Sequence, residues 1–348
     1  MIKEWNLLRA IACSSVLLLH ALTQTSRIVG HPQLDVYHFS RIILSFATPT
    51  FIILSIIILA NRYSTGLPEN FWAGRIKYIY LPFVFFGIID ALVRKYFNVN
   101  LIIDHKILDN ILTGKYEGWF VLVIFQFYFL FYLVIRFKPS MKWLFPVSLL
   151  IMGWYLYKIR GEFPSLNGLD YLLKISFLAW FGYFTAAFLI GKHYSYLAEK
   201  LFKYRWATIL LAAGAIGMMY ISYRYGYVEI SSRRIDLFPL VIALSALILA
   251  WGQRLPQSRI VNVISNYSFG IYLLHWQVQR FLSPYTAEFT SSYLIQVGVL
   301  FVSSLLISIL IIKIVSLLPF GAYLVGRVRK TKPIALNQQK SAIPKVVG

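Results

Sequence analysis

Two ionisable side chains, Arg9 and His20, lie within the first long apolar stretch of the sequence. An ionisable residue in such a stretch is costly in hydrocarbon, so each is a candidate for function. Eleven residues make about three turns of an α-helix, which places both side chains on one helix face, about 16 Å apart along the axis. This face could connect an anionic donor at the Arg9 end with an acceptor near His20.

Imidazole suits proton transfer near neutral pH, because its unperturbed pKa is about 6.5. A general base must also reach the hydroxyl that it deprotonates. His20 is therefore a candidate base, and His275, in a later apolar stretch, is a second candidate. A structural alternative stays open for both ends of the first stretch. Arg9 could extend to lipid head groups, and each histidine could hydrogen-bond to a neighbouring helix.

A basic segment, Arg75-Ile-Lys77-Tyr-Ile-Tyr-Leu-Pro82, leads into the third apolar stretch. Cations at a membrane interface suit the phosphates of a nucleotide-bearing donor such as acyl-coenzyme A, which they would bind by charge-assisted hydrogen bonds. The alternative is a basic anchor that fixes topology. The sequence has no Gly-rich phosphate loop, and no spacing of His, Asp and Glu resembles a metal site. We therefore predict no metal.

The composition indicates a membrane protein. Hydrophobic residues make up 59% of the 348 positions and charged residues 14%, whereas soluble chains average about 25% charged residues. The formal net charge of +21 comes from Lys and Arg in short segments between apolar stretches, where they fix topology and meet anionic lipids. We therefore predict membrane lipid, and not nucleic acid, as the partner of these charges. The single cysteine, Cys13, excludes an intrachain disulfide.

Apolar stretches long enough to span a bilayer, about 20 residues each, recur along the chain. They predict an all-α, polytopic integral membrane helix bundle with about ten transmembrane helices, because backbone polar groups in lipid must be satisfied within each segment. Pro49 is expected to kink the second span, and residues 95–116 to form an interfacial helix or loop. The predicted spans are 5–24, 38–60, 77–94, 117–137, 142–158, 171–191, 205–223, 235–252, 265–282 and 291–317.

The chain divides into a membrane domain, residues 1–323, and a basic tail, residues 324–348, which its polar composition predicts to be disordered. The predicted loops on the two sides of the membrane hold equal numbers of Lys and Arg. The basic tail gives the side that holds the termini the larger number. Because basic residues favour the inner side, both termini are predicted to be cytoplasmic.

Several motifs stand in a fixed order along roughly residues 4–320. The motifs are Leu7-Leu8-Arg9-Ala10-Ile11-Ala12 with His20 eleven residues after the arginine, Thr48-Pro49-Thr50-Phe51, the basic segment ending at Pro82, Gly118-Trp119-Phe120, and Ser265-Asn266-Tyr267-Ser268 continuing to His275. Together they resemble the membrane acyltransferase 3 family, and the chain is most similar to its intercellular adhesion protein C branch. The resemblance to that branch implies a polysaccharide O-acyl or succinyl transferase.

This resemblance implies an enzyme of a bacterial cell membrane that moves an acyl group from acyl-coenzyme A to a hydroxyl of a cell-surface polysaccharide, as in biofilms, without a permanently bound cofactor. It implies that His20 is the catalytic base and Arg9 its essential partner, and that Arg75 and Lys77 bind the donor. One departure is Ile79, since many members carry a further arginine at that place. Residues expected to support substrate binding or the structure are Glu4, Trp119, Gln126, Ser268, Tyr272 and His275.

Two other functions fit the same helices. An exopolysaccharide exporter could line a sugar path with aromatic side chains. A non-catalytic subunit of a polysaccharide synthase complex would need no chemistry at Arg9 or His20. In both alternatives the polysaccharide is a partner of the protein. In the second alternative the synthase complex is a partner as well.

Overall fold

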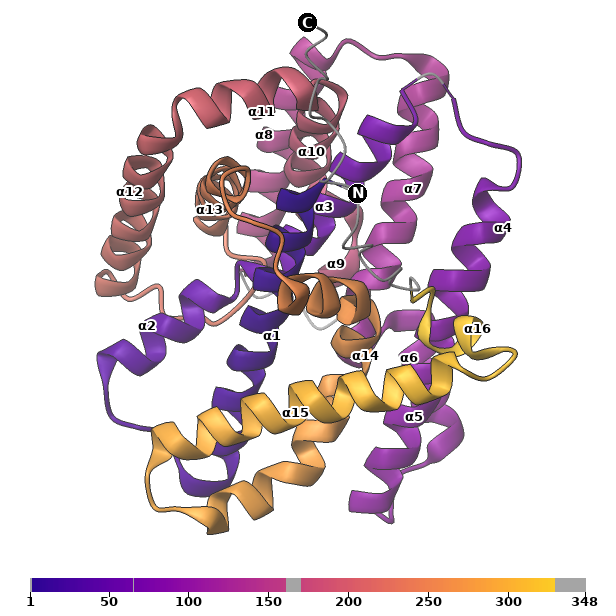
Figure 1. Cartoon of the computed structure of the whole chain (residues 1–348), viewed down its shortest axis with the longest axis vertical. Helices are drawn as coiled ribbons and strands as arrows, with labels where there is room; N and C mark the ends of the chain where they lie inside the picture. The colour runs from indigo at the N-terminus through magenta and orange to yellow at the C-terminus, as the bar shows by residue number, and fades with distance from the viewer. Residues whose placement is uncertain (1, 65, 161–169, 329–348) are drawn as a thin grey trace, which may run out of the picture.

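The computed structural model describes residues 2–64, 66–160 and 170–328, and every regular element in this part of the chain is helical. The all-α polytopic membrane bundle is confirmed (Figure 1). Seven described helical segments are long and apolar enough to cross a membrane, and α13 (Leu237–Gly252) is a shorter apolar helix. Most of the predicted tail, residues 329–348, lies outside the described residues.

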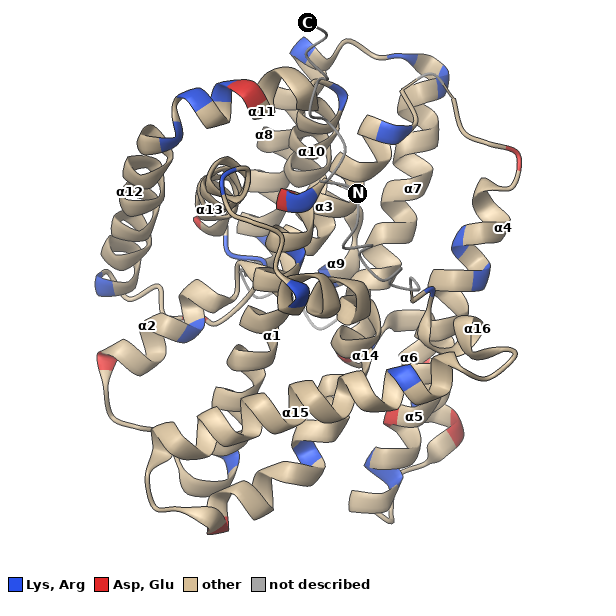
Figure 2. Cartoon of the chain, in the orientation of Figure 1, with Lys and Arg blue, Asp and Glu red and all other residues tan. Residues whose placement is uncertain are grey.

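The first helix, α1 (Lys3–Val29), runs through the middle of the bundle (Figure 1). Its most extensive packing is against α14 (Arg259–Phe289), and it also packs on α13 and α15 (Tyr293–Ser316). Small residues on its buried face, among them Ala12, Cys13 and Ala21, let neighbouring helices approach closely. Charged residues concentrate near the ends of the helices and in the loops, as membrane-spanning segments require (Figure 2).

The second span consists of two helices, α2 (Asp35–Leu44) and α3 (Ala47–Arg62), separated by a turn at Ser45 and Phe46. Proline has no N–H to donate to the carbonyl four residues earlier, and Ser45 stands four residues before Pro49. In the turn, the backbone N–H of Phe46 donates instead to the carbonyl of Ile43 at 3.1 Å. The break expected from Pro49 therefore lies just before it.

The third span is longer than predicted and begins with α4 (Phe71–Arg75). A π-helix, η1 (Ile76–Tyr80), follows and continues into α5 (Leu81–Phe97). This π-helical turn immediately precedes Pro82, which cannot donate the next regular hydrogen bond. Within the predicted interfacial region, α6 (Ile103–Thr113) folds back onto α5.

The span after α7 (Phe120–Phe137) and α8 (Met141–Arg160) is broken at Ser176. It consists of α9 (Asp170–Ile175), η3 (Phe177–Trp180) and α10 (Phe181–Lys192). Gln126 repairs the break, since its Nε2 donates to the Ile175 carbonyl at 2.9 Å and its Oε1 accepts from the Phe177 N–H at 2.9 Å. Broken helices persist in membranes only when their backbone groups find such partners.

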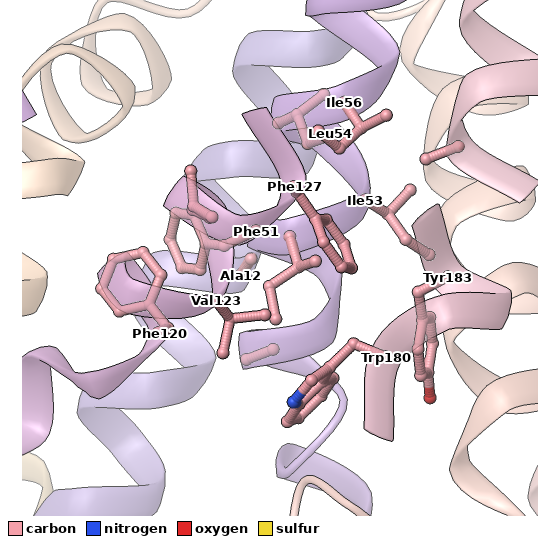
Figure 3. Close-up of a cluster of buried hydrophobic side chains, with 14 of the residues drawn as sticks. Ala12, Phe51, Ile53, Leu54, Ile56, Phe120, Val123, Phe127, Trp180 and Tyr183 are labelled. Carbon is pink, nitrogen blue, oxygen red and sulfur yellow. The ribbon is translucent and has the colours of Figure 1, made fainter. Parts of the chain in front are cut away.

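The segment between α10 and α12 (Arg205–Arg224) is a short helix, α11 (Tyr194–Lys203). The last described helix, α16 (Gly321–Val325), is short and packs on α5 and η1. The aromatic-rich core at the centre of the bundle joins α1, α3, α7 and α10 (Figure 3).

Gly191→Ala is expected to destabilise the bundle where α10 crosses α3. A Cβ at this position would lie 2.5 Å from the Ile57 carbonyl oxygen and 2.8 Å from the Ala60 Cβ, so the two helices would have to separate. Overpacking of this kind costs about 1–3 kcal/mol. Gly214→Ala in α12 is the matched control, because no atom lies within 4 Å of its added Cβ. Thermal unfolding in detergent measures both, and equal midpoints for the two variants would contradict the close approach.

Candidate active site

His20 and His275 meet at the contact between α1 and α14. The Nδ1 of His20 lies 2.6 Å from the Nε2 of His275, and the two rings are parallel within 1°. On its other edge, the Nδ1 of His275 lies 3.0 Å from the backbone carbonyl oxygen of Ile271. His275 is completely buried, and the His20 side chain is 17% exposed. The pair therefore forms a hydrogen-bonded chain that ends in a partly open imidazole.

The carbonyl of Ile271 decides which ring nitrogens carry protons, because a carbonyl oxygen can only accept a hydrogen bond. His275 must carry its proton on Nδ1, which leaves its Nε2 as an acceptor when the ring is neutral. His20 then donates from Nδ1, and its own Nε2 carries the free lone pair. This assignment follows from the hydrogen-bond partners. It gives His20 the tautomer that a general base with an accessible Nε2 requires.

Glu117 is the acidic group next to this lone pair. Its Oε2 lies 3.9 Å from the Nε2 of His20, and its side chain is 23% exposed. It comes from η2 (Glu117–Trp119), the short turn that starts the α7 segment. The gap is too long for a direct hydrogen bond, so the carboxylate lies beside the imidazole without bonding to it.

Trp276 covers the other side of His20. Its ring meets the imidazole edge-on with centroids 4.9 Å apart, and the Arg27 guanidinium lies over the same indole at 5.0 Å from the ring centroid. Arg27 is seven residues after His20 and is exposed near the end of α1. The exposed edge of His20 thus lies beside Glu117, Trp276 and the far end of α1.

A cavity of about 670 Å³ lies at the opposite end of α1. Four arginines line it, and the described lining includes no Asp or Glu. The described lining therefore carries a positive charge, and an anion with several charges fits this cavity. The arginines are Arg9, Arg62, Arg75 and Arg327.

Aromatic rings hold Arg75 at the cavity wall. Its guanidinium lies 4.8 Å from the ring centroid of Phe71 and 5.0 Å from that of Tyr128. Its buried Nε has no hydrogen-bond partner among the described residues. Arginine in this setting is preorganised for planar, bidentate contact with phosphate or carboxylate oxygens.

Arg9 is fixed to α14. Its Nη1 lies 3.5 Å from the Ser265 Oγ, which in turn donates to the Asn6 side-chain oxygen at 3.2 Å. Asn6 donates to Asn262 at 3.0 Å, so a polar network ties the first turns of the two helices together. Arg9 and His20 therefore face the same partner helix, one at each end of its contact with α1.

Lys77, which was predicted to bind the donor, is exposed and lies outside the described cavity lining. The prediction treated the two cations as one basic segment. Side chains two residues apart on a helix do not face the same side, and Arg75 at the end of α4 and Ile79 in η1 line the cavity whereas Lys77 does not. Ile79 therefore places an uncharged side chain in the cavity.

The other predicted supporting residues divide between the site and the scaffold. Ser268 and Tyr272 line the cavity, whereas Gln126 holds the broken span. The buried Glu4 accepts a 3.0 Å hydrogen bond from the hydroxyl of Tyr194 on α11, and Trp119 packs against Trp180 with ring centroids 5.5 Å apart.

The sequence reasoning missed Glu117, Arg62 and Arg327. Each stands at an end of a helical segment, where a charged residue is ordinary, so composition and spacing gave no signal for the two arginines. Glu117 directly precedes the Gly118-Trp119-Phe120 motif, and that position could have identified it. The described residues contain no group of three or more His, Cys, Asp or Glu that could hold a metal ion.

Comparison with known proteins decides the family. The acyltransferase domain family matches residues 2–313. The chain belongs to this acyltransferase family. It is 33% identical over 290 residues to a protein of Bacillus subtilis (strain 168) named as the membrane-bound acyltransferase YfiQ, with 79% of this chain and 80% of that protein covered. The acyltransferase match and this relative support an enzyme that transfers acyl groups.

Other relatives of this acyltransferase carry a different name. The chain is 26% identical over 323 residues to a protein of Staphylococcus aureus (strain MSSA476) named as a poly-beta-1,6-N-acetyl-D-glucosamine export protein, covering 87% of this chain and 90% of that one. A protein of the same name from Staphylococcus epidermidis is 24% identical over 300 residues, covering 83% and 84%. No solved structure matches the chain.

Arg75→Ala is expected to weaken binding of a polyphosphate anion to the cavity, measured with coenzyme A on the purified protein in detergent. A charge-assisted hydrogen bond contributes about 1.5–3 kcal/mol, so the dissociation constant should rise roughly tenfold to a hundredfold. Lys77→Ala removes one positive charge two residues away without touching the cavity, and it should leave binding nearly unchanged. An equal loss in both variants would mean that only the total charge of the segment matters.

Proposed function

We propose that this acyltransferase moves an acyl group from acyl-coenzyme A to a hydroxyl of a bacterial cell-surface polysaccharide, with His20 as the general base. The observation that carries the proposal is the His20–His275 pair, whose partners leave the Nε2 of His20 as the free base. An imidazole held in one tautomer and one orientation needs little reorganisation during proton transfer.

The arginine cavity supports the choice of donor. Coenzyme A carries several phosphate charges on its nucleotide, and Arg62, Arg75 and Arg327 offer guanidinium groups to them. Arg9 lies between these and the histidines along α1, about 16 Å from His20 by helical rise. A donor anchored by its phosphates would extend its thioester arm toward His20. We place the cavity on the cytosolic side of the bacterial cell membrane, where acyl-coenzyme A is made.

The reaction then needs one proton transfer in each direction. The Nε2 of His20 takes the proton of the sugar hydroxyl as its oxygen attacks the thioester carbonyl carbon. The resulting tetrahedral intermediate breaks its C–S bond, which forms the sugar ester and releases the thiolate. The His20 imidazolium returns the proton to sulfur, giving free coenzyme A. No covalent acyl-enzyme is required, and the enzyme ends in its starting state.

His275 and Glu117 stabilise the charged form of His20 during this cycle. Once Nε2 is protonated, the Nδ1–H bond to His275 becomes charge-assisted and therefore stronger. Glu117 adds an opposite charge 3.9 Å away. In this arrangement the Nε2 of His275 positions the base by accepting a hydrogen bond from the Nδ1–H of His20, and a backbone carbonyl fixes His275 in turn.

Export of a polysaccharide is the second candidate, because relatives of the chain are named as export proteins. An exporter needs a continuous path for sugars and no base. It would tolerate loss of the His20 imidazole as long as the path remained open.

His20→Gln is expected to abolish O-acyl esters on the surface polysaccharide while the polymer still reaches the cell surface. Loss of general-base catalysis lowers rates roughly a hundredfold to ten-thousandfold, whereas glutamine keeps a polar side chain of similar size. Ester content by mass spectrometry and polymer location by surface staining measure the two functions separately. Polymer trapped inside the cell would favour export, and unchanged ester content would eliminate the proposed base.

His275→Ala is expected to lower kcat roughly tenfold to a hundredfold, with a much smaller change in KM, because His20 loses the group that orients it. His275→Gln can offer a side-chain oxygen to the Nδ1–H of His20 and should recover part of the loss. Steady-state release of coenzyme A thiol by membrane vesicles measures both parameters. Equal activity of the two variants would contradict a role for the accepting atom, and a KM effect alone would place His275 in substrate binding.

A further inference from the structure

The histidine pair and the arginine cavity occupy separate spaces. His20, His275 and Glu117 are outside the described lining of the cavity, although His20 and Glu117 are 17% and 23% exposed. The exposed edge of His20 lies beside Trp276, whose indole faces Arg27 near the far end of α1. A group bound in the cavity and a group touching His20 approach from opposite directions.

Three aromatic rings stand between the two spaces. Phe51, Phe120 and Tyr272 all line the cavity, and Tyr272 is one helical turn before His275, with ring centroids 5.8 Å apart. The Tyr272 ring lies 4.2 Å from Phe120 and 5.6 Å from Phe51, centroid to centroid. Its hydroxyl lies 3.3 Å from the Thr48 Oγ1. The rings thus close the end of the cavity that faces the histidines.

The position of these rings differs from that of ordinary core aromatics. Figure 3 shows Phe51 and Phe120 together at one edge of the buried cluster, while Phe127 of the same helix as Phe120 lies deeper among Ile53, Trp180 and Tyr183. Phe127 is fully buried, packs on Phe184 and is not part of the described cavity lining. Phe51 and Phe120 both contact Tyr272, which lines the cavity and also lies against His275.

We propose that Phe51, Phe120 and Tyr272 form an aromatic barrier that the acyl group must cross to reach His20, and that this barrier determines which acyl groups the enzyme accepts. The inference rests on the proposed function, because it assumes a donor in the arginine cavity and a base at His20. The thioester carbonyl passes between rigid rings, so a short acyl group needs a small ring displacement and a longer or branched one a larger displacement. Close-packed interiors resist each added methylene.

The first experiment measures acyl selectivity in membrane vesicles that contain the full-length protein and the surface polysaccharide. Acetyl-, propionyl-, butyryl- and hexanoyl-coenzyme A are offered separately, and the esters formed are quantified by mass spectrometry. The unaltered protein should prefer short acyl groups. Phe120→Leu and, more strongly, Phe120→Ala should raise the relative rate with hexanoyl-coenzyme A about tenfold or more, since one methylene is worth roughly tenfold to two-hundredfold in a fitted pocket.

Phe127→Leu is the matched control. It replaces a buried aromatic ring of the same helix by a smaller side chain, at a position that does not line the cavity. It should leave the chain-length profile unchanged even if it lowers stability. An unchanged profile in Phe120→Leu and Phe120→Ala, with esters still formed, would overturn the barrier as the selectivity element. Absence of esters from every donor in the unaltered protein would instead defeat the proposed function.

A second experiment tests the barrier without any acyl transfer. In a Cys13→Ala background, Ser55→Cys reports the cavity and Glu117→Cys reports the histidine side, because Cys13 is buried and is the one native cysteine. A membrane-impermeant thiol reagent is added to right-side-out or inside-out vesicles. The two cysteines should react from opposite sides, and adding Phe120→Ala should let Glu117→Cys react from the cavity side too. Reaction of Glu117→Cys from the cavity side with all rings intact would overturn the barrier.

Discussion

The hydrogen bond between His20 and His275 is the contact on which the rest of the site depends. In hydrocarbon an unpartnered imidazole is costly, so the two rings and the Ile271 carbonyl satisfy one another in a single chain. This chain fixes the rotation of α1 against α14. The same rotation brings Arg9 to Ser265 at the other end of the helix contact. One polar contact thus orients both ends of the reactive face.

The charges of the molecule are arranged around this contact in two unequal groups. The cavity side holds arginines without described acids, which suits a multiply charged anion. The histidine side holds one carboxylate beside an imidazole, which suits a charge that appears and disappears during proton transfer. Rings of Phe51, Phe120 and Tyr272 separate the two.

Interrupted helices shape the site more than long straight ones do. The turn before Pro49 starts α3 one turn before the cavity-lining Phe51, and the junction of α4 with the π-helix places Arg75 and Ile79 at the cavity. The span that is broken at Ser176 does not run through the core as one continuous helix, and Gln126 satisfies the backbone groups at the break. Each interruption leaves backbone groups that must find partners, so such breaks persist where surrounding side chains satisfy them.

The sequence by itself determined the helical membrane bundle, since apolar length and backbone hydrogen bonding in lipid leave few alternatives. It also determined that Arg9 and His20 share a face, because that relation depends only on helical rise and turn. The tertiary structure alone decided that the partner of His20 is His275, 255 residues away. It likewise placed Glu117, Arg62 and Arg327 at the site and turned Lys77 outward. A charged residue at a helix end has the same local pattern as a topological anchor, and only the packing of distant helices shows which of them face a common cavity.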